Sequence, residues 1–275
     1  MNQDLRYVLA VDIGNTRLKW AFHDGRSWVA QGACSTSNTI SHAILVKEWA
    51  LLASLIVTKS KKSPTFRAII SNVADKAIAD TVLEALNDIG CMAGEIITPR
   101  AAQAGVRNSY IRASQLGSDR WLALIAAYNL MKINTQISGE VAYSQLVVMA
   151  GTALTIDALT ADGTFLGGVI VPGVALMQAA LNLGTARLPA TAGLYEIFPT
   201  ATQNAIYTGA IEASLGVLQR MQYALTERTN NKVKCIASGG GMTLLLPHLT
   251  TLTFPVAVHD NLVLEGLIRV ANEHC

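Results

Sequence analysis

The chain has 275 residues, 51% of them hydrophobic and 15% charged, which suffices for one large domain or two of ordinary size with buried cores. The net charge is only +2 and the Lys and Arg residues are dispersed. This distribution of charge argues against nucleic-acid binding as the main function of the protein. The four cysteines lack paired spacing, which predicts a cytoplasmic protein without disulfides. No apolar stretch reaches about 18 residues, so we expect no membrane partner.

The first predicted element is a buried strand in the mostly apolar run YVLAVDIG, which ends at Asp12 and meets a turn at Gly14-Asn15. The following segment, Thr16 to His23, alternates apolar and polar residues with the period of two that a half-buried strand shows. A second turn at Asp24-Gly25 leads into a third extended segment. The chain therefore begins with an antiparallel meander.

The same order of elements recurs near the middle of the chain. The strand QLVVMAG runs into Thr152-Ala153, LTIDAL forms the second arm, and Asp162-Gly163 leads into TFLGGVIV. Gly14 precedes Gly25 by eleven residues and Gly151 precedes Gly163 by twelve. This spacing indicates an internal duplication at low sequence identity.

Alternating helices and strands are predicted after each meander. After the first they are an apolar-patterned segment over 42–56, a strand over 66–74 and a helix over 76–89 with Asp75 as its N-cap. After the second they are helices over 174–183 and 204–227, the strands VKCIA and PVAVH, and a final helix over 262–273. We expect an α/β protein of two halves, residues 1–140 and 141–275, around a shared cleft.

Both repeated turns suit the binding of phosphate groups. Backbone N–H groups approach a phosphate closely where Gly and small hydroxyl residues form a tight turn at a strand end, as in Gly14-Asn15-Thr16 and Gly151-Thr152. Asp12 is placed to hold Mg²⁺ near those phosphates, directly or through water. The Walker and dinucleotide fingerprints are absent, and either turn taken alone is also typical of an ordinary hairpin.

A third motif, Gly117-Ser118-Asp119-Arg120, opens a helix whose apolar face begins at Trp121. Ser118 is interpreted as its N-cap, which puts Asp119 in the first turn, where the helix dipole favours an ionised carboxylate. Asp119 could then accept a hydrogen bond from a substrate hydroxyl in phosphoryl transfer, and Arg120 could clamp a carboxylate or phosphate. The alternative is that these polar residues only cap the helix.

A glycine run, Ser238-Gly239-Gly240-Gly241, follows an apolar strand in the second half. Three successive glycines suit the close passage of an adenine or ribose, and they suit a plain sharp turn equally well. Both interpretations stay open at this point.

Taken together, these motifs resemble the type III pantothenate kinases, the family of the Bvg accessory factor. The resemblance covers nearly the whole length and rests on five segments: DIGNT at 12–16, GSDR at 117–120, GTALTID at 151–157, GGVIVPG at 167–173 and TARLP at 185–189. Each segment is short, but their order and combination are specific.

The resemblance implies an actin-like ATPase (ASKHA) fold of two duplicated halves, a homodimer with an active site shared across the interface, and ATP-dependent phosphorylation of pantothenate, the first step towards coenzyme A. Asp119 resembles the catalytic base. The expected pantothenate contacts are Tyr110, Gly117, Ser118, Arg120 and, from the partner subunit, Thr185. The expected ATP and phosphate contacts are Asp12, Gly14, Asn15, Thr16, Lys19, Gly151 and Thr152. The implied cofactors are Mg²⁺, held by Asp12, and a monovalent cation, K⁺ or NH₄⁺.

One position departs from the family pattern. The family usually has Asp two residues before the second glycine turn, where this chain has Met149. A thioether does not replace a carboxylate as a Mg²⁺ ligand. Two alternative functions are therefore kept: another actin-like small-molecule kinase or phosphatase, and a non-catalytic regulatory accessory protein of the same fold.

Overall fold

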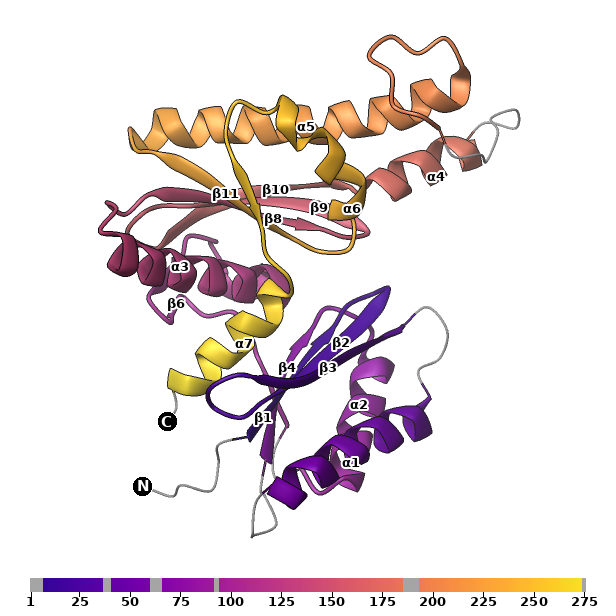
Figure 1. Ribbon diagram of the computed structural model, residues 1–275, viewed down its shortest axis with the longest axis vertical. Coiled ribbons are helices and arrows are strands. Elements are labelled where there is room, and N and C mark those ends of the chain that lie inside the picture. Colours follow the sequence, from indigo (N-terminus) through magenta and orange to yellow (C-terminus); the bar gives the residue numbers. More distant parts are fainter. Residues whose placement is uncertain (1–6, 37–40, 60–65, 92–93, 185–192, 274–275) are drawn as a thin grey trace. The chain divides into compact units, whose positions relative to one another are not determined.

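The computed structural model describes residues 7–36, 41–59, 66–91, 94–184 and 193–273 (Figure 1). The chain forms two compact units that do not follow a single cut in the sequence. The first unit comprises residues 1–104, 112–126 and 263–275, and the second comprises residues 105–111 and 127–262.

The first unit is built on a five-stranded sheet of order β3-β2-β1-β4-β5. Its strands are β1 (Tyr7–Ile13), β2 (Arg17–His23), β3 (Trp28–Ser35), β4 (Phe66–Asn72) and β5 (Gly94–Ile96). β1, β2 and β3 pair antiparallel, whereas β4 pairs parallel with both β1 and β5. Two helices, α1 (His42–Lys59) and α2 (Lys76–Asp88), bury Trp49 and Val82 against the apolar side chains of β1, β2 and β4 (Figure 1).

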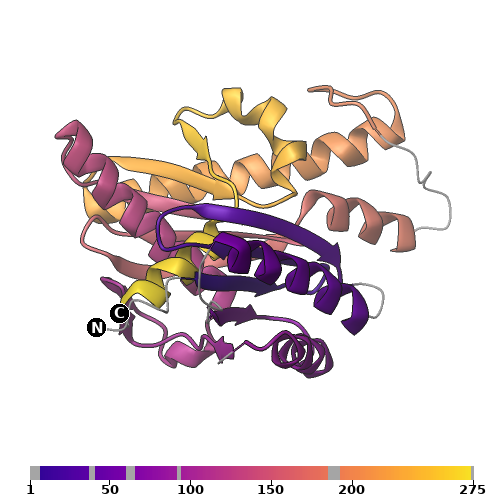
Figure 2. The same cartoon turned by 60° about the horizontal axis from the view of Figure 1, so that its bottom comes forward.

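The larger sheet has the order β12-β11-β8-β9-β10-β7-β6, and all of its strands except β6 belong to the second unit. Its strands are β8 (Ser144–Ala150), β9 (Ala153–Leu159), β10 (Thr164–Pro172), β11 (Val233–Ser238), β12 (Val256–Val258), β7 (Val106–Asn108) and β6 (Ala102–Gln103). Helix α5 (Thr202–Thr229) covers this sheet with Ile211, Leu215 and Leu218. Helix α4 (Val174–Gly184) lies beside α5 (Figures 1 and 2).

The predicted internal duplication is confirmed by the pairing of the strands. In the first sheet, β1 pairs antiparallel with β2 and parallel with β4; in the second, β8 pairs antiparallel with β9 and parallel with β11. The order β3-β2-β1-β4-β5 thus recurs as β10-β9-β8-β11-β12. The two repeats share a topology although their sequences differ.

Most predicted elements form close to their expected bounds. The final helix, α7 (Leu262–Glu273), matches its predicted range, and α3 (Ser118–Ser138) begins at the predicted motif. Asp75 occupies the N-cap position of α2, as predicted, although its carboxylate makes no capping hydrogen bond. Six short elements of the described residues were not predicted: β5, β6, β7, α6 (Met242–Leu245) and the 3₁₀ turns at Ala113–Gln115 and Leu246–Thr251.

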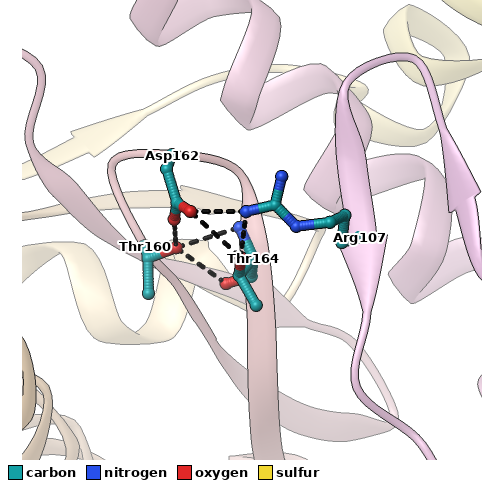
Figure 3. A network of polar contacts seen from close by, with 4 residues as sticks. All are labelled: Arg107, Thr160, Asp162 and Thr164. Carbon is teal, nitrogen blue, oxygen red and sulfur yellow. Dashed lines mark hydrogen bonds and ion pairs between the residues drawn. The ribbon is translucent and has the colours of Figure 1, made fainter.

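A polar network holds β7 beside the β9–β10 hairpin (Figure 3). The Arg107 guanidinium donates to the Asp162 carboxylate and, at 2.7 Å, to the hydroxyl of Thr164. The backbone N–H of Arg107 also donates to the carbonyl of Gly163 at 2.8 Å. The exposed ion pair contributes little free energy by itself, so its effect is to fix the position of the short strand that leads to Tyr110.

No helix in the part of the chain that the structure describes is long and apolar enough to cross a membrane.

Helices α3 and α7 approach each other closely at Gly266. A Cβ atom at this position would lie 2.1 Å from the carbonyl oxygen of Leu122 and 2.6 Å from its carbonyl carbon. Gly216, in α5, is exposed and has no atom within 4 Å of its Cβ position. The two glycines therefore differ in packing while both lie inside helices.

We expect Gly266→Ala to lower the free energy of unfolding by about 1–3 kcal/mol, because backbone atoms must separate to admit the methyl group. Gly216→Ala, the matched control, should raise it by about 0.5–1 kcal/mol through the better helix propensity of Ala. Urea unfolding of both variants measures the difference, and equal effects would contradict the close packing at Gly266.

Candidate active site

Asp12 lies at the carboxyl end of β1, at the centre of the first sheet. Its register partners are Lys19 on the antiparallel strand β2 and Ser71 on the parallel strand β4. The side chain is partly exposed, but Oδ1 is buried and accepts no hydrogen bond from the described residues. An unpaired buried carboxylate oxygen is costly, so this atom is suited to receive a ligand from outside the chain.

The pKa of Asp12 also indicates that its carboxylate is suited to receive a ligand from outside the chain. Burial and, to a smaller extent, the negative charge of Asp119 together raise the pKa of Asp12 from 3.8 to about 7, against the opposing effects of Lys19 and the Ser71 hydrogen bond. A carboxylate whose negative charge is this poorly compensated gains most from a bound cation. The residues present at this site therefore fit Mg²⁺, which prefers oxygen ligands.

Asp119 lies in the first turn of α3, as predicted. Its Oδ1 accepts a hydrogen bond from the backbone N–H of Arg120 at 2.7 Å. Burial raises the pKa of Asp119, while that N–H group and the Arg120 guanidinium act in the opposite direction. The carboxyl group is thus more basic than an exposed one and is held by the start of its own helix.

Gly117 leaves the space that Asp119 occupies. A Cβ atom at residue 117 would lie 2.5 Å from Oδ1 of Asp119. Any larger residue would push the carboxylate away or force the backbone to move. The glycine is therefore explained by the position of the acid that follows it.

The interpretation of Ser118 as an N-cap was wrong. Ser118 is the first residue of α3, and its Oγ lies 3.0 Å from Oγ of Ser71 and donates to the carbonyl of Asn72 at 3.3 Å. Both serines are buried. The hydroxyl connects the helix to the end of β4 instead of to its own second turn.

The first glycine turn joins β1 to β2. The N–H of Gly14 donates to the carbonyl of Arg17 at 3.1 Å, and Thr36 supports the turn twice, through its N–H to Thr16 and its hydroxyl to Gly14, each at 3.0 Å. Asn15 and Thr16 are exposed at its tip. Hydrogen bonds with Arg17 and Thr36 thus hold the turn in place, while the residues at its tip stay accessible to a ligand.

The second glycine turn, in the second unit, has the same construction. The N–H of Gly151 donates to the carbonyl of Ala153 at 2.9 Å, and Thr152 accepts from the N–H of Gly173 at 2.9 Å. A Cβ atom on Gly173 would lie 2.3 Å from the Gly151 carbonyl, and Gly151 and Thr152 are exposed. Gly173 therefore allows direct backbone contact with this turn.

The glycine run after β11 packs against the same strand end. Gly239, with φ +107°, would place a Cβ atom 2.2 Å from the carbonyl of Ala150, and the N–H of Gly241 donates to that carbonyl at 2.9 Å. Gly239 is therefore required by the fold itself, whereas a Cβ atom on Gly240 would have no atom within 4 Å. A role in binding adenine or ribose stays a prediction.

Met149 occupies the place in the second repeat that Asp12 occupies in the first. It is paired with Thr155 on β9 and Ser238 on β11, as Asp12 is with Lys19 and Ser71. The hydroxyl of Thr155 is buried without a hydrogen-bond partner among the described residues. The second repeat thus keeps the scaffold and lacks the carboxylate.

The remaining predicted residues lie in different places. Tyr110 belongs to the second unit, where its ring packs on Phe165 at a centroid distance of 5.5 Å. Arg120 is only 5% exposed, and Thr185 lies outside the described residues.

The structure brings Asp12, Lys19 and Asp119 together in the first unit, joined there by a residue that was not predicted, Ser71. One signal in the sequence could have identified Ser71. It lies at the carboxyl end of a predicted strand, and the carboxyl ends of neighbouring parallel strands meet at one edge of a sheet.

The two repeated sheets, each with a glycine turn after its first strand, define an actin-like protein. A 2-dehydro-3-deoxygalactonokinase-type protein from Sinorhizobium meliloti is similar in fold, with a TM-score of 0.54, 15% identity and coverage of 98% of this chain and 99% of that one. MreB5 of Spiroplasma citri bound to ADP matches with a TM-score of 0.50 and 8% identity over 99% of this chain and 100% of that one. These likenesses show the fold alone.

The sequence narrows the class to one family. Residues 8–224 match the family model described as type III pantothenate kinase. A type III pantothenate kinase of Nitrosospira multiformis is 39% identical over 97% of this chain and 91% of its own length, and one of Dechloromonas aromatica is 37% identical over 96% and 98%. The chain belongs to the type III pantothenate kinase family.

Asp12→Asn should stabilise the free protein at high pH. Because the folded-state pKa of about 7 lies above the ordinary 3.8, ionisation of Asp12 penalises folding fully above pH 7, and the penalty fades as pH falls towards 3.8. At about pH 8 we expect the free energy of unfolding to rise by an amount on the order of a few kcal/mol, with a higher Tm, and this gain should shrink by about pH 5.

Asp24→Asn is the control for this experiment. The carboxylate of Asp24 lies in an exposed turn, where the N–H groups of Ser27 and Arg26 lower its pKa. Asp24→Asn should therefore not raise the Tm at any pH. A pH-independent effect of Asp12→Asn would contradict a carboxylate at residue 12 whose ionisation destabilises the fold.

Proposed function

We propose that this protein transfers the γ-phosphoryl group of ATP to the primary hydroxyl of pantothenate, giving 4′-phosphopantothenate and ADP in the first step of coenzyme A biosynthesis. The family relationship over nearly the whole chain supports the reaction. The observation that carries the proposal within the structure is the pair of electrostatically coupled carboxylates, Asp12 and Asp119, on neighbouring elements of the first unit.

Asp119 is proposed as the base of this reaction. The pantothenate oxygen forms a bond to the γ-phosphorus, the bond from that phosphorus to the bridging oxygen of ATP breaks, and the electron pair leaves with ADP. The hydroxyl proton passes to the Asp119 carboxylate. Burial makes this carboxylate a better proton acceptor, while the N–H of Arg120 fixes its position.

The proposed ATP contacts are the two glycine turns. When bound with ATP, Mg²⁺ offsets the charge of the phosphates, and Asp12 would hold it. Asn15 and Thr16 on the first turn, and Thr152 on the second, are exposed residues with donor groups, and Gly151 has no side chain to keep a phosphate away from the second turn. Lys19 adds a positive charge beside Asp12.

The proposed pantothenate contacts are Tyr110, Gly117, Ser118 and Arg120, with Thr185 supplied by the partner subunit. A requirement for K⁺ or NH₄⁺ is proposed with them, on the strength of the family relationship. Activity compared in K⁺, NH₄⁺ and Na⁺ salts tests that requirement.

A coupled assay of ADP formation with a panel of small alcohols tests the proposed function. Turnover that depends on pantothenate and on ATP is expected. Equal turnover with other alcohols would favour another actin-like kinase, release of phosphate without an alcohol would favour a phosphatase, and no turnover at all would favour a non-catalytic accessory protein.

Asp119→Asn should lower kcat by about 10²- to 10⁴-fold, because the amide has the shape of the carboxylate but cannot accept the hydroxyl proton. The thermal stabilisation by Mg²⁺ and ATP should be largely retained. Near wild-type turnover in the folded variant would remove Asp119 from the catalytic role.

A homodimer is the proposed active form. Exposed apolar side chains gather on α4 and on the segment before α5: Leu176 is 43% exposed, Leu194 71% and Phe198 91%. Surfaces of this kind are typical of protein interfaces. Light scattering should give about twice the chain mass at micromolar concentration, and Phe198→Glu should lower it. An active monomer would contradict a shared site.

A further inference from the structure

Ser71 lies at the centre of the site and has no role in the reaction described so far. It is fully buried at the carboxyl end of β4, in register with Asp12. Its hydroxyl is a hydrogen-bond partner of the Asp12 carboxylate and lies 3.0 Å from the hydroxyl of Ser118, the first residue of α3. One side chain therefore contacts both elements that carry the two carboxylates.

The direction of these hydrogen bonds follows from the chemistry of the groups. An ionised carboxylate only accepts, so Ser71 must donate its single proton to Asp12. The oxygen of Ser71 can then only accept from Ser118, whose single proton it shares with the carbonyl of Asn72, 3.0 Å and 3.3 Å from the Ser118 hydroxyl respectively. The hydrogen bonds thus connect Ser118, at the start of α3, through Ser71 to Asp12. Removal of either hydroxyl leaves a buried group with one hydrogen-bond partner fewer.

The second repeat contains the same connection without the carboxylates. Ser238, which pairs with Met149 as Ser71 pairs with Asp12, accepts a hydrogen bond from the N–H of Leu262 at 3.4 Å. Leu262 is the first residue of α7, as Ser118 is of α3, and the next residue is Val263 where α3 has Asp119. Both repeats thus join a strand end to the start of a helix through a serine.

We propose that Ser71 is a positioning residue of the phosphoryl-transfer site, whose hydroxyl sets the place of the cation-binding Asp12 relative to the helix that carries the base Asp119. The inference rests on the proposed function and deepens it. Loss of an outer partner of a metal-binding group typically costs about 10- to 100-fold in metal affinity or activity. A purely structural serine would change only the stability of the fold.

Ser71→Ala and Ser118→Ala separate the two connections. Ser71→Ala removes both hydrogen bonds, so it should raise the Mg²⁺ concentration at half-maximal activity and lower kcat, each by about 10-fold or more, with KM for pantothenate little changed. Ser118→Ala leaves the bond from Ser71 to Asp12, so it should lower kcat without moving the Mg²⁺ midpoint.

Ser214→Ala is the matched control. Ser214 is also fully buried, and its hydroxyl donates only to the carbonyl of Ala210, 2.8 Å away in the same helix. This variant should change stability slightly and leave kcat and the Mg²⁺ midpoint as in the wild type.

A measurement without turnover distinguishes this inference from the proposed function. The rise in Tm produced by Mg²⁺ with a non-hydrolysable ATP analogue should be smaller in Ser71→Ala than in the wild type and in Ser214→Ala. If the wild type does not phosphorylate pantothenate, the proposed function fails, and the Tm comparison still tests Ser71. An unchanged Mg²⁺ midpoint and Tm response in folded Ser71→Ala would overturn the inference. If Ser71→Ala does not fold, full kcat in Ser118→Ala would overturn it.

Discussion

The structure of the first unit is organised around a carboxylate that the chain itself does not neutralise. Asp12 ends the central strand β1 with one oxygen buried and unpaired, and the nearby charge of Asp119 adds to the cost of ionisation. A fold that only needed stability would place an apolar or fully paired residue here. The unfavourable charge is best understood as a site kept ready for a cation, because a bound ion reverses the sign of the local potential.

The duplication separates what the scaffold needs from what the chemistry needs. Both repeats contain the glycine turn after the first strand, the serine at the end of the parallel neighbour and a helix that starts beside that serine. Only the first repeat has acids at the two decisive positions, Asp12 and Asp119. The scaffold is therefore symmetric, whereas its charges are confined to one repeat.

Long elements and the fold class could be predicted from the sequence because period and turn residues determine them locally. The helix over 262–273 and the two meanders are examples. The short strands β5, β6 and β7 could not be predicted, since two or three residues carry no period, and β7 is held in place by Arg107 and Asp162, which are far apart in the sequence.

For the site, the acids could be predicted from their motifs, but the partners of the hydroxyl groups could not. Ser118 has the residue type and position of a helix cap, and only the fold shows that its hydroxyl contacts Ser71, 47 residues away. Such a contact leaves no local pattern.

Met149 marks the position at which the second repeat lacks the acid of the first repeat. Its register partners Thr155 and Ser238 are both hydroxyl residues, and the hydroxyl of Thr155 is buried without a partner among the described residues. A carboxylate at 149 would have had two such donors beside it, so the polar surroundings persist where the acid is missing. Because a thioether is a poor ligand for Mg²⁺, residue 149 itself supplies no ligand for a cation. The cation site proposed at Asp12 would then depend on Asp12 and on the residues that hold Asp12 in place, which would make the hydroxyl of Ser71 more important than in a site with two acids.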